Sequence, residues 1–160
     1  KGECMKTSLG IDVGMNGALS FYDGNELIIY DMPVFERNKT KRVHAIRLAD
    51  IILLNNPDFA YIEQVNAFGM GATSAYNFGW SCGLIEGVVS SCKVPLSYVT
   101  PQVWKKEMQC PKDKDASRMR ASQLLPQFSH NWDLKKHDGR AEASLIALYG
   151  FRKLGFTHEK

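Results

Sequence analysis

The order of strand-like and helix-like segments is the feature that most restricts the fold of this chain. Three short apolar runs, 7–13, 18–23 and 26–31, are separated by the turns GMNG and DGN, which predicts an antiparallel meander that Pro33 closes. Beyond a basic loop that begins at residue 36, strands over 59–65 and 94–99 alternate with helices over about 43–54 and 74–92. Further helices follow over 100–108, 116–128 and 138–154. This order predicts an α/β protein with a five-stranded mixed sheet flanked by helices.

Composition excludes several other classes. The chain has 160 residues, 44% of them apolar, which suits one compact domain with a real core. No apolar run approaches the roughly 20 residues of a membrane helix, so we expect no membrane partner and a location in the cytoplasm. Four cysteines without a CxxC pair argue against a zinc site. The formal charge of +3 neither demands nor excludes a polyanionic partner.

Four acidic residues occupy apolar surroundings. On a helical wheel, Asp138 and Glu142 continue the apolar stripe of Leu145 and Tyr149. Two like charges four residues apart repel each other, and burial without a partner would cost far more. Taken alone, each acid also suits an ordinary role, as a first-turn residue favoured by the helix dipole or as a solvated strand end.

The two remaining acids strengthen the case for a shared site. Asp12 lies within the strand LGIDVG, where aspartate is disfavoured, and Glu63 ends the apolar strand FAYIEQ. Acids delivered by three separate elements favour one converging cluster. Four carboxylates around one point suit Mg²⁺, and two such ions can promote phosphodiester hydrolysis.

Four sequence blocks resemble the RuvC-type Holliday junction resolvases, in particular their bacteriophage and chloroplast branches. The blocks are GIDVGMNGALSFYD, YIEQVNAFGMGATSAYNFGWSCGLIEGVV, VTPQVWKKEM and KKHDGRAEASLIALYG. The resemblance implies a ribonuclease H-like nuclease domain over residues 6–156, with a tail over 157–160. Residues 1–5 are expected to be a disordered start or a cloning remnant.

The resemblance also implies an activity and its residues. It implies a homodimer that places two symmetric nicks across four-way junction DNA, with two Mg²⁺ ions per site, for which Mn²⁺ can substitute. By position, the catalytic and metal-binding residues are Asp12, Glu63, Asp138 and Glu142. The closing motif departs from the bacterial pattern, in which an acid stands where this chain has Gly139. Whether His137 or Asp138 lies nearer to the metal is therefore open.

Candidate DNA contacts come from one loop and several basic groups. In the family that the chain resembles, an aromatic residue of the loop after the catalytic glutamate stacks on opened base pairs. Phe68 is the candidate for this role, and Met70 lies beside it in the same loop. The alternative is that both side chains are buried beneath the loop. Trp80 and Trp104 are expected in the core. The basic candidates for phosphate contact are Lys105, Lys112, Lys114, Arg118, Lys135, Lys136 and His137.

Three glycines recur every fourth residue within the long central helix, although each costs up to about 1 kcal/mol there relative to alanine. Gly79, Gly83 and Gly87 indicate a close approach, either to the sheet or to the helix of a second copy. We assign them to the dimer interface.

Other functions remain as alternatives. The opening IDxGxxG hairpin also occurs in sugar kinases, but no second phosphate loop is present, so no nucleotide cofactor is expected. A non-catalytic junction-binding protein and a nuclease acting on branched or flap DNA more broadly are the other readings. The expected location is the cytoplasm of a bacterial or phage-infected cell, and an organelle stroma is the alternative.

Overall fold

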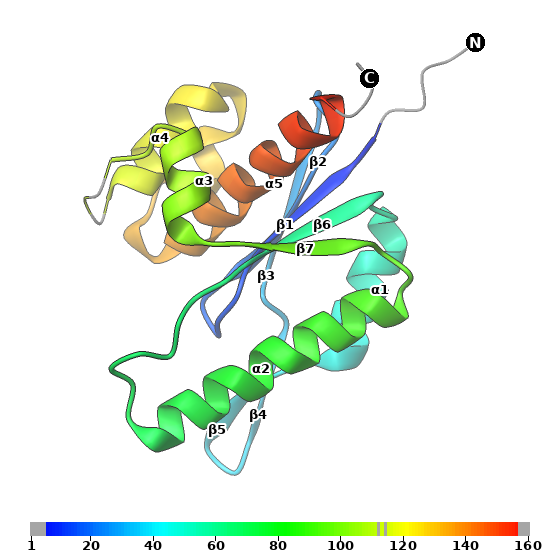
Figure 1. Ribbon diagram of the computed structural model, residues 1–160, viewed down its shortest axis with the longest axis vertical. Helices are drawn as coiled ribbons and strands as arrows, with labels where there is room; N and C mark the ends of the chain where they lie inside the picture. The colour runs from blue at the N-terminus through cyan, green and yellow to red at the C-terminus, as the bar shows by residue number, and fades with distance from the viewer. Residues whose placement is uncertain (1–5, 112, 114, 157–160) are drawn as a thin grey trace.

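The central element is a five-stranded mixed sheet. The computed structural model describes residues 6–111, 113 and 115–156 (Figure 1). The sheet order is β3-β2-β1-β6-β7, in which β1 pairs antiparallel with β2 and parallel with β6. Its strands are β1 (Ser8–Asp12), β2 (Ala18–Tyr22), β3 (Leu27–Asp31), β6 (Phe59–Glu63) and β7 (Leu96–Val99). The five-stranded mixed sheet expected from the sequence is therefore confirmed.

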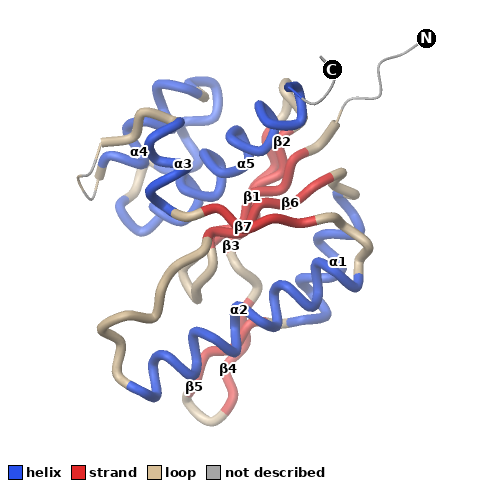
Figure 2. The backbone as a smooth tube through the Cα atoms, viewed as in Figure 1, coloured by secondary structure: helices blue, strands red, loops and turns tan. Residues whose placement is uncertain are grey.

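Helices cover both faces of the sheet, and each face has its own core (Figures 1 and 2). One face is covered by α1 (Ala45–Asn55) and α2 (Ala72–Ser91). The other carries α3 (Pro101–Glu107), α4 (Ala116–Leu124) and α5 (Asp138–Phe156), together with the 3₁₀ turns η1 (Pro126–Trp132) and η2 (Lys135–His137). No helix in the described ranges is long and apolar enough to cross a membrane.

Strand β1 divides its side chains between the two layers. Leu9 and Ile11 are fully buried in the core beneath α1 and α2. Gly10 lies on the opposite face, where a Cβ atom would collide with the backbone of Ala143 and Ala147 in α5. The missing side chain therefore lets α5 lie directly on the strand that carries Asp12.

Two expectations about local structure were wrong. The basic segment forms a hairpin of β4 (Val34–Arg37) and β5 (Thr40–Val43), whose turn residues Asn38 and Lys39 have φ angles of 50° and 59°. Its strand residues are mostly exposed and lack an apolar period, so the sequence pattern did not reveal them. The helix expected to run to 128 ends at Leu124. Pro126 disfavours helical backbone angles at the residue before it, Leu125.

Candidate active site

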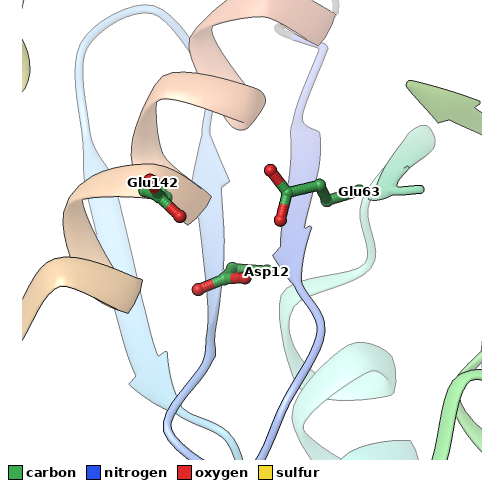
Figure 3. A group of neighbouring side chains, drawn as sticks. All are labelled: Asp12, Glu63 and Glu142. Atoms are coloured by element: carbon green, nitrogen blue, oxygen red, sulfur yellow. The ribbon is translucent and has the colours of Figure 1, made fainter. Parts of the chain in front are cut away.

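Three of the four predicted acids converge at one end of the sheet (Figure 3). Asp12 ends β1, Glu63 ends the parallel neighbour β6, and Glu142 lies one turn into α5. One oxygen of each carboxylate lies within 4.8 Å of the others. Parallel strands end at the same edge of a sheet, and α5 packs closely on β1, so the fold itself brings the three together.

Burial and mutual repulsion make this group electrostatically unfavourable on its own. Burial, followed by the charges of Glu63 and Glu142, raises the pKa of Asp12 well above its ordinary value. Burial also raises the pKa of Glu63, a residue that is only 6% exposed, although a hydrogen bond from Trp104 opposes the shift. A cation at this point would remove the repulsion and favour the ionised carboxylates.

Three further side chains hold the carboxylates in place. The indole Nε1–H of Trp104, which is fully buried, donates to Glu63 Oε1 at 3.0 Å. The Ser117 hydroxyl donates to Glu142 Oε1 at 2.9 Å, and Lys105 Nζ lies 3.2 Å from the same oxygen. The first two contacts could not be predicted from the sequence, because no pattern in it links position 104 to 63 or position 117 to 142.

This donor set fits a hard divalent cation. All three groups offer carboxylate oxygens, the ligands that Mg²⁺ and Mn²⁺ prefer. Burial raises the pKa of both Asp12 and Glu63, and a cation bound between them would oppose this shift. The chemistry of the site therefore agrees with a bound metal ion.

Asp138 lies outside this group. Its Oδ1 lies 2.7 Å from Arg118 Nε, and 41% of its side chain is exposed. Gly139, not Asp138, faces the site, since a Cβ atom there would lie 3.0 Å from Asp12 Oδ2 and closer still to the Asn16 carbonyl oxygen. There is no room for an acid at position 139, and a metal-binding role for Asp138 stays a prediction.

The loop between β6 and α2 displays the predicted apolar side chains. Phe68 is 94% exposed and Met70 is 39% exposed, so burial beneath the loop is ruled out for Phe68. Trp104 lies in the core as expected, but the expectation was wrong for Trp80, which is 44% exposed.

The basic residues predicted to contact DNA lie in different surroundings. Lys135, Lys136 and His137 line a cavity of about 550 Å³ beside the start of α5. Burial lowers the pKa of His137. Arg118 is held by Asp115 and Asp138 at 2.6 and 2.7 Å. Lys112 and Lys114 lie outside the described residues.

The glycine repeat lies on the solvent side of α2. Gly79, Gly83 and Gly87 are exposed, and no heavy atom outside the helix's own backbone lies within 4 Å of the Cβ position of any of them. They therefore do not serve packing on the sheet, and their role at a dimer interface stays a prediction.

Comparisons with solved structures identify the fold. The chain is similar to Thermus thermophilus RuvC in complex with a Holliday junction substrate, with a TM-score of 0.64 and 16% identity over 95% of this chain and 97% of that one. It is also similar to the yeast mitochondrial Holliday junction resolvase Ydc2, with a TM-score of 0.62 and 14% identity over 97% of this chain and 82% of that one. The chain has the RuvC-type fold. A second Thermus RuvC structure agrees, with a TM-score of 0.60 and 16% identity over 93% and 96% of the two chains.

The RuvC-type fold is conserved here at low sequence identity. No protein-family model and no curated protein sequence matches the chain. The RuvC-type architecture predicted from four short motifs is therefore established by structure, and the activity is a separate question.

Proposed function

We propose that the protein is a divalent-metal-dependent endonuclease that resolves four-way DNA junctions by paired symmetric nicks. The observation that carries the proposal is the convergence of Asp12, Glu63 and Glu142 at the edge of a RuvC-type sheet. Two of the similar proteins are RuvC bound to a Holliday junction and a Holliday junction resolvase, which supports four-way DNA as the substrate.

The three carboxylates would hold the metal, for which we propose two Mg²⁺ ions per site, with Mn²⁺ as a substitute. Bound there, such ions supply an activated water and charge stabilisation for the leaving oxygen. Trp104 and Ser117 fix two of the carboxylates through hydrogen bonds, so that these ligands are oriented in advance. The Lys105 ammonium group, 3.2 Å from Glu142, supplies positive charge where a phosphate would approach.

The remaining predicted contacts would position the junction. We propose that the exposed Phe68 ring, beside Met70, enters the opened junction, since apolar wedges stabilise distorted DNA. Basic side chains near the start of α5 would contact phosphates. We keep Lys112, Lys114, Arg118, Lys135, Lys136 and His137 as candidates for this role.

Paired nicks require two active sites, so we propose a homodimer. The exposed glycine face of α2 would allow two copies of the helix to approach closely. Light scattering on the purified protein measures its mass directly. Gly83→Leu, which places a bulky side chain on this face, is expected to shift the dimer toward the monomer.

The substrate is tested by incubating the protein with labelled four-way junctions, flaps, duplexes and RNA–DNA hybrids in Mg²⁺. We expect symmetric nicks in the four-way junction and little cutting of linear duplex. Cleavage of flaps with equal efficiency would indicate a broader branched-DNA nuclease. Binding without cutting would indicate a non-catalytic junction-binding protein.

The metal site is tested by Asp12→Asn and Glu142→Gln. Each removes one ligand charge with little change of shape, so we expect cleavage to fall by at least about 10³-fold while junction binding is retained. Asp50→Asn, an exposed acid on α1, is the control and should cleave normally. Full cleavage by either active-site variant would refute the proposed site.

A further inference from the structure

The β4–β5 hairpin is a positively charged projection that the proposed catalytic site does not use. Residues 34–43 contain four cations, Arg37, Lys39, Lys41 and Arg42, against the single carboxylate of Glu36, a net charge of +3. No ion pair between described residues includes any of the four cations. None of the four side chains is therefore held in an ion pair within the described part of the chain.

The hairpin holds these charges in a defined geometry. Arg37 pairs with Thr40, which leaves a two-residue turn, and both turn residues have the left-handed backbone of a type I′ turn. At the base, the rings of Phe35 and His44 pack edge to face at 5.5 Å, and the His44 amide donates to the Pro33 carbonyl at 2.8 Å. The turn therefore presents Lys39 at the tip of an ordered ribbon.

One face of the hairpin, together with α2, forms a basic and aromatic hollow of about 320 Å³. Alternate strand residues share a face, so Phe35, Arg37 and Arg42 point together toward Trp80. The Arg42 guanidinium lies 3.9 Å above the centre of the Trp80 ring. Its Nη1 is buried and has no hydrogen-bond partner among the described residues.

The opposite face of the hairpin differs. Glu36 and Lys41 are cross-strand partners there, so positive and negative charge lie opposite each other. The hollow beside Trp80 is lined by two arginines and no acid. Substitutions on the two faces can therefore be compared within a single hairpin, to test whether only the face beside Trp80 binds a polyanion.

The hairpin lies far from helices α3 and α4, which carry Lys105 and Arg118. Figure 1 shows β4 and β5 beside α2 at one end of the molecule, with α3 and α4 at the other end. Val34, at the start of β4, also lines the cavity that contains Lys135 and Lys136 beside the active site. This cavity therefore connects the start of α5 to the base of the hairpin.

We propose that the β4–β5 hairpin binds the sugar-phosphate backbone of a junction arm, through Arg37 and Arg42 in the hollow beside Trp80 and through Lys39 in the turn next to it. The inference rests on the proposed function, because it assumes that DNA is the substrate. Arginine and lysine neutralise phosphates and release counterions, and an arginine stacked on an aromatic ring is already oriented for this contact. The site is specific for backbone charge and shape, not for base sequence.

Binding to a labelled four-way junction tests the proposal. The parent protein carries Asp12→Asn to prevent cutting, and its affinity is measured by fluorescence anisotropy over a range of salt concentrations. Arg37→Gln and Lys39→Asn are each expected to weaken binding about five- to tenfold at 0.1 M salt. Each should also make the negative slope of log affinity against log salt shallower by about 0.9, because one phosphate contact is lost.

Matched controls keep the result interpretable. Lys93 is also an exposed turn lysine with positive φ, 63° against 59° for Lys39, but it precedes β7 at the opposite edge of the sheet from the carboxylates. Lys93→Asn therefore repeats the charge and backbone change of Lys39→Asn away from the proposed contact. Lys41→Gln removes a charge from the other face of the hairpin. Both controls should leave affinity and salt slope near the parent values.

Each contrary outcome has its own meaning. If the parent binds junctions and the Arg37 and Lys39 variants keep its affinity and salt slope, the hairpin contact is wrong and the proposed function stands. If these variants change the mass measured by light scattering, the hairpin is a protein interface and the inference is overturned. If the parent binds no junction, the proposed function fails and the hairpin contact fails with it.

Discussion

The hydrogen bond between Trp104 and Glu63 orients one carboxylate of the candidate site. The indole is completely buried, and its N–H donates to Oε1 of the Glu63 carboxylate. This donor lowers the pKa of Glu63 against the stronger effect of burial. Trp104 is therefore a positioning residue that favours the ionised carboxylate without touching the substrate.

Trp104→Phe is expected to raise the Mg²⁺ concentration needed for half-maximal cleavage by about 10-fold or more, as for other groups that orient metal ligands. The ring is largely retained, while the oxygen of Glu63 loses its donor. Metal titration of the cleavage rate, together with calorimetric metal binding, measures the effect.

Trp132→Phe is the control for this substitution. Trp132 is equally buried and donates to the Ser122 hydroxyl at 2.9 Å, away from the acids. Both variants should lose some stability, but only Trp104→Phe should change the metal requirement. An equal change in both would show that general loosening of the core is responsible.

The contact between β1 and α5 sets the position of the third carboxylate. Because Gly10 faces the backbone of α5 and not flexible side chains, a methyl group there can be accommodated only by moving the helix. We expect Gly10→Ala to destabilise the fold by about 1–3 kcal/mol, as in other overpacked cores, and to weaken metal binding through displacement of Glu142. Thermal unfolding and calorimetry measure the two effects.

Gly155→Ala, in the last turn of α5, provides the comparison within the same experiment. No heavy atom lies within 4 Å of the Cβ position there, so the substitution should leave the free energy of unfolding unchanged or raise it by up to about 1 kcal/mol through helix propensity. If Gly10→Ala unfolds at the same temperature as the parent protein, the close packing of α5 on β1 is not as described.

Elements with a clear apolar period could be predicted from the sequence, whereas contacts between elements could not. The strands that end in Asp12 and Glu63 consist mostly of apolar residues, so the pattern predicted both strands and the acid at the end of each. The exposed β4–β5 hairpin has no such period, and its turn uses Asn38 and Lys39 without a glycine. Asp138 shares a helical face with Glu142, but a wheel does not show that Arg118 of α4 lies within 2.7 Å of it.

Across the whole molecule, the three-acid group lowers stability at neutral pH when no metal is bound. Folding raises the pKa of Asp12 and Glu63, so the folded protein holds protons more tightly than the unfolded chain. This contribution is therefore most favourable at low pH and is lost as the pH rises from about 4, the ordinary carboxyl pKa, through the raised values.

Asp12→Asn is expected to raise the metal-free melting temperature at neutral pH by a few degrees, corresponding to about 1–2 kcal/mol. Mg²⁺ should raise the melting temperature of the unaltered protein and have little effect on this variant. Asp50→Asn should leave both temperatures unchanged. A lower melting temperature for Asp12→Asn would contradict the electrostatic description of the site.

The last of the three carboxylates comes from α5, more than one hundred residues beyond the first. During synthesis Asp12 and Glu63 leave the ribosome long before Glu142, and any fragment that stops short of α5 lacks a ligand. For the nuclease proposed above, an unfinished or truncated copy would therefore be unable to cut DNA, because the three-carboxylate group is complete only when the final helix packs against the first strand.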